Sequence, residues 1–454
     1  MLESERNLTL KQNMKHLFRA HLLIVIKRFG LPLSFFAMLT LQLVLLINAD
    51  LDSKAFWFQC IAQSLFASGL CLIGVSTLSE TKKWPRSAYY SVSFALILGI
   101  FALHWAPPPF AQYSLLLLGL YVFLFVAPFV LEEHAQNDTI FVYLYRLSIA
   151  GIFAGLTTTV IFLGVFSLQG LVTVLFEFPF SFKITLTILT LLAGLCAPCI
   201  ALASVPLKVQ ALNITHLPTR ASYIFSFVLI PLVLIYAGTI YVYALKIGAS
   251  RVTPQGVLAY FTLGFAIVGV IAHWYVSSIP HPKGFLYFYK QAFPWLFLLP
   301  LGLLIWSIYL RVLQYGLTPA RYSVVLMTIW LFCITLYSLL YRQHNLRFSL
   351  LLLLALSLVG ALGPLSVNNV TLMSQKKRLM SLLEKHGLVE QGEMIKISKD
   401  VPLEDRKSIA SCLYSIHSVG RLADLAPLFP AENLKGLSYR DLHNLLADRG
   451  IKAR

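Results

Sequence analysis

The stretch that decides the fold runs from residue 291 to residue 322 and reads QAFPWLFLLPLGLLIWSIYLRVLQYGLTPARY. Its first part, 291–310, carries no charge and is long enough to cross about 30 Å of hydrocarbon as a helix. Gly316 then permits a turn, and Thr318-Pro319 is typical of an N-cap followed by proline at the first helical position. The stretch therefore predicts a membrane span, a tight hairpin and the start of a second span.

The rest of the chain has the same character. Of its 454 residues, 58% are hydrophobic and 12% are charged, whereas a soluble domain has about 45–50% apolar and about 25% charged residues. Backbone groups in lipid must be satisfied internally, so each apolar span is helical, and the alternating segments of a β-barrel are missing. The sequence predicts an all-α polytopic transmembrane bundle of about eleven spans. They lie near 31–49, 55–77, 87–105, 110–131, 146–175, 181–205, 222–245, 256–278, 291–310, 322–341 and 347–368.

The distribution of Lys and Arg predicts the orientation. Residues 1–30 form a basic segment with six Lys/Arg, and with the N-terminus in the cytoplasm the inside segments hold 16 Lys/Arg against 6 outside. Residues 31–368 are then the transmembrane domain, and an odd number of spans puts the tail outside the cytoplasm. The stretch 146–175 is long for one upright helix and contains four glycines, so it tilts, breaks or re-enters. If this stretch does not cross the membrane as one span, the predicted orientation of every later span and of the tail is reversed.

The tail, 369–454, has the composition of a small soluble helical domain. Leucine and isoleucine recur at helical spacing in three places, and Ser438 is an N-cap candidate for the third helix. It shows no catalytic motif. We interpret it as an extracytoplasmic packing or interaction domain through which a protein partner binds.

The charge layout is the main functional signal. All 19 acidic residues lie in 1–177 or 384–454, while 178–383 holds 14 Lys/Arg and no carboxylate. These cations either pair with anionic lipid headgroups and set topology, or line a basic cleft for an anionic ligand. In the first half, where the acidic residues are few, Asp138 and Arg146 are candidates for a structural ion pair. The candidate contacts for an anion or headgroup are Arg311, Tyr315, Gly316, Thr318, Arg321 and Tyr322.

Other chemistries find little support. No catalytic residue, metal set, cofactor motif or nucleic-acid signature stands out, so the sequence favours a non-enzyme. Cys196 and Cys199 have thioredoxin-like spacing but lie inside an apolar span, which argues against a redox role. His273 precedes Trp274 and fits an interfacial aromatic belt first, a buried hydrogen-bonded histidine second, and a functional histidine third.

Three segments carry a family resemblance. They are Tyr315-Gly316-Leu317-Thr318-x-x-Arg321-Tyr322, the stretch from Tyr223 through Pro231 to Lys246 followed by Thr253-Pro-Gln-Gly256, and Gly363-Pro364-Leu-Ser366 followed by Ser374-Gln375-x-x-Arg378. Together they resemble an uncharacterised family of bacterial multi-pass membrane proteins, domain of unknown function four-one-five-three. Val367 departs mildly from the family pattern. The resemblance implies a helical protein of the bacterial cytoplasmic (inner) membrane, and it implies no activity, cofactor or catalytic residue.

Two functional hypotheses follow. The first is transport or handling of an anionic small molecule or lipid, supported by the carboxylate-free second half and by Pro231, Pro294 and Pro300, which we expect to interrupt helices along a cavity. The second is a non-catalytic membrane scaffold or sensor whose tail binds a protein partner.

Overall fold

The structure is a computed structural model. It describes residues 2–49, 56–105, 108–132, 135–178, 180–250, 257–341, 344–390, 393–395, 401–429, 434 and 437–448. The motif segment Thr253–Gly256 lies outside these ranges. The chain divides into two compact units: the first comprises 1–107 and 120–217, and the second comprises 108–119 and 218–454.

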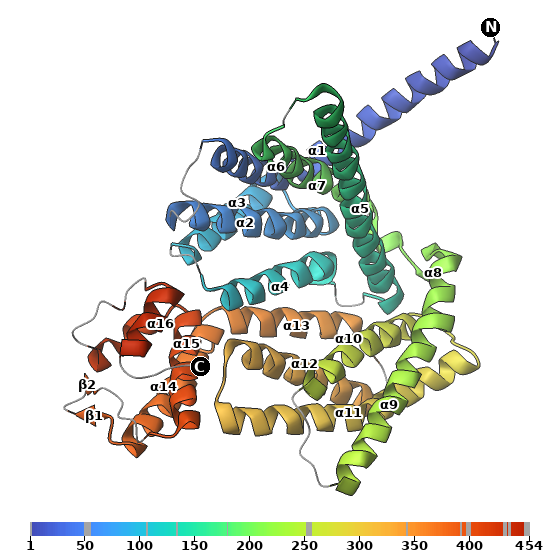
Figure 1. The fold of residues 1–454 in the computed structure, drawn as a ribbon. Coiled ribbons are helices and arrows are strands. Elements are labelled where there is room, and N and C mark those ends of the chain that lie inside the picture. The colour runs from blue at the N-terminus through green and yellow to red at the C-terminus, as the bar shows by residue number, and fades with distance from the viewer. Residues whose placement is uncertain are drawn as a thin grey trace. The chain divides into compact units, whose positions relative to one another are not determined.

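The first unit is built from helices around the buried helix α2 (Figure 1). Small residues of α2 let large side chains approach closely: Gly69 lies against the ring of Phe36, and Gly74 against that of Phe123. Within the part of α1 that crosses the apolar region, Phe29 departs from helical geometry and kinks the helix. The elements are α1 (Leu2–Asn48), α2 (Phe56–Thr81), α3 (Arg86–Leu103), α4 (Phe110–Val126, which begins in the second unit), α5 (Asn137–Phe176), α6 (Phe182–Leu191) and α7 (Ala197–Ala203).

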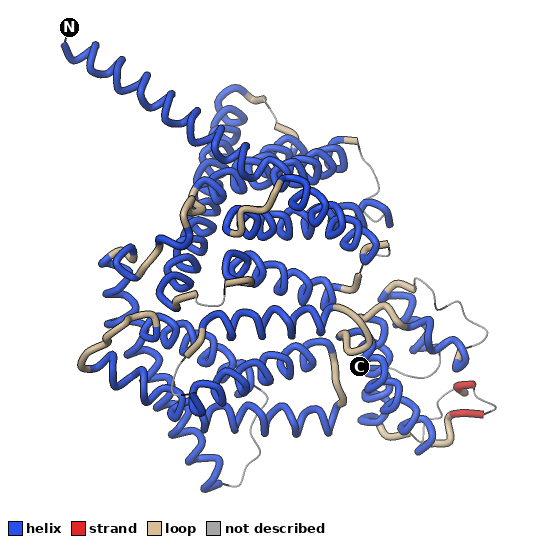
Figure 2. Tube along the Cα trace, turned by 180° about the vertical axis from the view of Figure 1, so that it is seen from behind, coloured by secondary structure: helices blue, strands red, loops and turns tan. Residues whose placement is uncertain are grey.

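The second unit contains a helical layer and the tail. Helices α11, α12 and α13 run side by side in both views (Figures 1 and 2), and α10 packs on α11. The ring of Trp330 in α12 donates a hydrogen bond of 2.8 Å to the carbonyl of Ser349 in α13, which ties these two helices together. The membrane-region elements are α8 (Thr219–Tyr223), α9 (Ile230–Ser250), α10 (Val257–Ser277), α11 (Phe285–Tyr315), α12 (Pro319–Tyr341) and α13 (Leu346–Ala361).

The tail has its own hydrophobic core, in which side chains such as Leu379, Leu413 and Leu442 are fully buried. The predicted N-cap is confirmed, since the Ser438 hydroxyl accepts from the backbone N–H of Asp441 at 3.2 Å. The boundary at 369 stays a prediction, because α14 begins just before it. The elements are α14 (Val367–Lys385), β1 (Val389–Glu390) antiparallel to β2 (Glu393–Met394), α15 (Leu403–Ser418) and α16 (Tyr439–Asp448).

The all-α polytopic fold is confirmed. Among the described residues, ten helices are long and apolar enough to cross a membrane, and α13 is a shorter apolar helix of 16 residues. The predicted eleventh span, 347–368, is therefore not among these ten. Its helix, α13, is only about 24 Å long, because Gly363 adopts a φ of +74° just after it and Pro364 follows. The ambiguous stretch 146–175 lies in α5, a single uninterrupted helix of 40 residues.

The expectation that prolines interrupt the helices is wrong. Helix α11 continues through Pro294 and Pro300. Helical π-segments at Leu192–Cys196 and Ile224–Leu229 lie just before Pro198 and Pro231. A proline clashes with the carbonyl four residues earlier, and a widened turn relieves that clash without ending the helix.

Candidate functional site

The hairpin that joins α11 to α12, residues 311–322, has the predicted turn. Gly316 follows the last residue of α11 with a φ of +68°, a conformation that favours glycine. Its N–H donates to the carbonyl of Val312 at 2.9 Å, which closes the last turn of α11. Thr318 immediately precedes α12, and its carbonyl accepts from the N–H of Tyr322 at 2.9 Å. The sequence therefore predicted the local geometry of this turn.

The hairpin docks on α14, a contact that sequence reasoning missed. The Gln375 amide donates to the carbonyls of Tyr315 at 3.1 Å and Leu317 at 2.9 Å. The Ser374 hydroxyl accepts from the N–H of Leu317 at 2.8 Å. Gln375 is fully buried, so these bonds satisfy its amide nitrogen where water has no access. Two of the three family segments are thus the two sides of one contact.

Arginines surround the carbonyl end of α11. Arg321 donates to the Gly316 carbonyl at 3.0 Å, and Arg378 donates to the Tyr315 carbonyl at 2.9 Å. Both guanidinium groups also lie over the ring of Tyr315, at 5.1 and 5.7 Å from its centroid. Cations are favourable here because the last carbonyls of a helix carry partial negative charge. Arg311 lies on α11 four residues before Tyr315, close enough to Arg321 for the two charges to repel each other. We call Arg311, Arg321 and Arg378 the arginine cluster.

Tyr322 connects the hairpin to the first part of the third family segment, Gly363 to Ser366. Its side chain is buried, and its hydroxyl donates to the carbonyl of Leu365, inside Gly363-Pro364-Leu-Ser366. Arg378 extends the contact into the tail by donating to the Ser408 hydroxyl of α15 at 3.3 Å. The hairpin thus links the end of the membrane helices to the first helices of the tail.

The charge at this site is uncompensated within the described part of the chain. No carboxylate pairs with any member of the arginine cluster there, and residues 178–383 contain none in sequence. Arg321 and Arg378 have a structural role, because each donates a hydrogen bond to a carbonyl at the end of α11. Arg311 donates no hydrogen bond among the described residues, and its exposure is intermediate. The arrangement can therefore attract an anion while it holds the tail in place.

The predicted pair Asp138–Arg146 is not brought together. Both residues lie on α5, eight positions apart, which corresponds to about 12 Å along a helix. Asp138 instead accepts from the backbone N–H of Thr139 at 2.7 Å. The expectation placed Arg146 at the start of a helix that in fact begins at Asn137.

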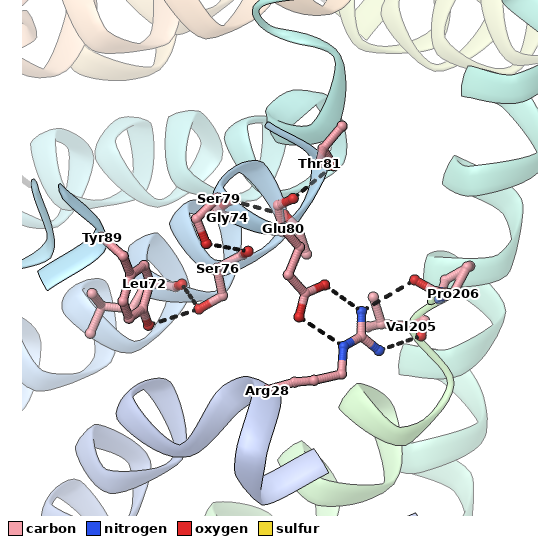
Figure 3. Close-up of polar contacts among 11 residues, drawn as sticks. Arg28, Leu72, Gly74, Ser76, Ser79, Glu80, Thr81, Tyr89, Val205 and Pro206 are labelled. Carbon is pink, nitrogen blue, oxygen red and sulfur yellow. Dashed lines mark hydrogen bonds and ion pairs between the residues drawn. The ribbon is translucent and has the colours of Figure 1, made fainter. Parts of the chain in front are cut away.

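A second polar cluster, in the first unit, has no counterpart among the candidates from sequence (Figure 3). Arg28 of α1 forms two hydrogen bonds with the Glu80 carboxylate of α2, at 2.9 and 2.7 Å. It also donates to the carbonyls of Val205 at 3.0 Å and Pro206 at 3.2 Å. The partners are 52 residues or more apart in sequence, so no local pattern could have predicted them. The sequence analysis treated Arg28 only as one of six basic residues that set the topology. In the structure it also connects α1 to α2 and to the loop after α7 through these hydrogen bonds, and we call this set of contacts the Arg28 latch.

The described residues contain no group of three or more His, Cys, Asp or Glu side chains placed to hold a metal ion. Among curated proteins and among solved structures, none matches the chain significantly. The sequence profile of one family matches residues 67–398, about three quarters of the chain, and this range includes all three resemblance segments. The chain is therefore an integral membrane protein that belongs to the family described as domain of unknown function (DUF4153).

Proposed function

We propose that this integral membrane protein handles an anionic small molecule or lipid, and that the arginine cluster contacts the anionic group. The observation that carries the proposal is the gathering of three guanidinium groups around the end of α11 with no carboxylate partner in the described residues. Arginine presents a planar fork of donors suited to phosphate and carboxylate oxygens. The site lies where α11 ends and α12 begins, two helices long and apolar enough to cross a membrane, and lipid headgroups are expected at the ends of such helices. The proposal puts the protein in the bacterial cytoplasmic membrane with its N-terminus in the cytoplasm, as the positive-inside count predicts.

The test compares lipid retention by the full-length protein and by variants. The double substitution Arg311→Gln with Arg321→Gln removes two cations of the cluster. We expect several-fold less phosphatidylglycerol to co-purify, with phosphatidylcholine retention unchanged. The matched control is Lys376→Gln with Lys377→Gln, which removes the same charge from exposed positions of α14. Equal retention by the cluster variant and the wild type, or an equal loss in the control, would refute the proposal.

Arg321 also holds the turn, so the double variant could lose lipid through misfolding. Arg311→Gln alone separates the two effects, because Arg311 donates no hydrogen bond among the described residues. We expect it to keep the wild-type melting temperature and still reduce phosphatidylglycerol retention. An unchanged retention in this folded variant counts against the cluster.

A scaffold or sensor role is the second candidate. It is favoured by the chain of contacts from Gln375 and Arg378 to the hairpin and on to Ser408, which couples the tail to the membrane helices. A partner that co-purifies with the full chain and is lost on deleting 370–454 would support it. A monomeric protein that captures no partner from envelope extracts would count against it.

A further inference from the structure

A cavity of about 360 Å³ lies in the second unit, away from the arginine cluster. It is lined by the end of α10, the first turns of α11, the end of α12 and the residue His344 that precedes α13. Its lysine, Lys290, stands 21 residues before Arg311 on α11, which corresponds to about 30 Å. The cavity and the arginine cluster thus lie at opposite ends of the same helix.

Two buried polar side chains of this cavity have no hydrogen-bond partner among the described residues. They are the Nδ1 atom of His273, whose side chain is 4% exposed, and the hydroxyl of Ser277, one turn later on α10. A buried polar group without a hydrogen-bond partner is unfavourable, because it has lost its bonds to water and gained none in return. Both residues line the same cavity, so one ligand there would satisfy both.

The neighbouring groups fix the histidine in place. The ring of His273 stacks on Phe293 at 5.0 Å and meets the ring of His344 edge-on at 4.8 Å. His344 is held in turn by the Ser338 hydroxyl, 2.9 Å from its Nδ1 atom. The polar wall of the cavity is therefore assembled from three helices before any ligand enters, which lowers the entropy lost on binding.

Lys290 supplies the charge. It lines the cavity in a half-buried position, and no carboxylate pairs with it in the described part of the chain. None is available nearby in sequence, since 178–383 contains no Asp or Glu. A cation removed from water without a counter-charge is unfavourable. An anionic ligand would compensate it.

We propose that this cavity is a binding site for a phosphate group, carried by free phosphate, by a small phosphate ester or by a lipid headgroup. Lys290 provides the counter-charge, and His273 and Ser277 provide neutral donors. These donors come from two helices that face one volume, an arrangement that suits a tetrahedral oxyanion with several acceptor oxygens better than a planar carboxylate with two. The site is separate from the arginine cluster and does not depend on its function.

The experiment uses the full-length protein in phosphatidylcholine nanodiscs, which offer no anionic lipid. One arm measures equilibrium binding of radiolabelled inorganic phosphate. The other arm measures capture of phosphatidic acid doped into the same discs. Saturable phosphate binding assigns a soluble ligand, and capture of phosphatidic acid without phosphate binding assigns a lipid headgroup. Binding in neither arm overturns the proposal.

Variants locate the site. Lys290→Gln should weaken binding about tenfold or more, while Lys283→Gln, the same change at an exposed neighbouring position, should leave it unchanged. Ser277→Ala is the sharper variant: removing an unpartnered hydroxyl should leave the free protein equally stable or more stable, yet it should weaken binding. Binding unchanged in both Lys290→Gln and Ser277→Ala overturns the assignment. The double variant Arg311→Gln with Arg321→Gln should retain cavity binding, so failure of this site and failure of the arginine cluster are distinguishable.

Discussion

Gly316 is the residue on which docking of the hairpin depends. A Cβ at this position would lie 2.9 Å from the Gln375 amide nitrogen and 3.1 Å from the Ser374 hydroxyl, and the backbone has a φ of +68°. Gly316→Ala should therefore destabilise the protein by about 1–3 kcal/mol and loosen α14. Thermal unfolding with hydrogen exchange of 367–385 measures both effects. Gly302→Ala, inside α11 with open space around it, is the control, and equal effects of the two changes would contradict this account.

The turn could be predicted from sequence, but its docking partner could not. Gly316 and Thr318-Pro319 are local signals with local causes, and the structure confirms the turn. Gln375 satisfies carbonyls about 60 residues earlier in the chain, and only the family resemblance hinted that these segments belong together. Asp138 and Arg146 illustrate the opposite error, in which sequence proximity was taken for a contact that the helix geometry forbids.

Asp405 makes the stability of the tail sensitive to acid. Hydrogen bonds from Lys385 at 2.9 Å and from His386 at 2.7 Å hold the pKa of this carboxyl below its usual range. A lowered folded-state pKa contributes stability above the unfolded value of about 4, and that stability is lost as the pH falls toward the folded value. Asp405→Asn should cost about 0.5–1 kcal/mol at pH 7 and flatten the acid dependence below pH 4. Hydrogen exchange of 403–418 against pH tests this, with the exposed Glu404→Gln as control; the same flattening in the control would contradict it.

At the scale of elements, the hydrogen bonds of the Arg28 latch fix the loop after α7 against α1 and α2. Glu80→Gln should remove the negative charge and one of the two acceptor oxygens, while the bonds from Arg28 to the carbonyls of Val205 and Pro206 remain. The side chains are 14% and 36% exposed, so we expect a loss of about 1 kcal/mol and roughly fivefold faster exchange in 204–213. Arg86→Gln, exposed and close in sequence, is the control. Faster exchange spread over all of the first unit would indicate general destabilisation instead.

The helices themselves were predictable because lipid leaves the backbone few alternatives. Two features could not be predicted in this way. The π-segments depend on how the helix relieves the clash at Pro198 and Pro231, and the short length of α13 depends on the backbone conformation at Gly363. Pro294 and Pro300 were expected to interrupt α11, yet a helix of 31 residues continues through both. In the first unit, the burial of α2 follows from its glycines and serines, although its hydrophobicity alone resembles that of its neighbours.

At the scale of the whole molecule, the contact between the hairpin and α14 leads us to expect both on the same side of the membrane. The Ser374 hydroxyl of α14 accepts from the N–H of Leu317 in the hairpin. A topology reporter fused to the hairpin and one fused to the tail must therefore report the same side of the membrane. Since α5 is one continuous helix, the stretch most suspected of an extra crossing contains no break. With α13 as the eleventh span, we expect both the hairpin and the tail outside the cytoplasm.

Alkaline phosphatase and, separately, a fluorescent protein fused after Arg454 or after Leu317 test this prediction in a bacterial host. We expect phosphatase activity without fluorescence at both positions, and the reverse for fusions after Lys83, in a basic loop predicted to be cytoplasmic. Fluorescence without phosphatase activity at both Leu317 and Arg454 would show that the span count is wrong before α11. Opposite signals at these two positions would instead show that α12 and α13 do not both cross, and would contradict the docking of α14 on the hairpin. The two fusion sites together therefore separate an error in topology from an error in the fold.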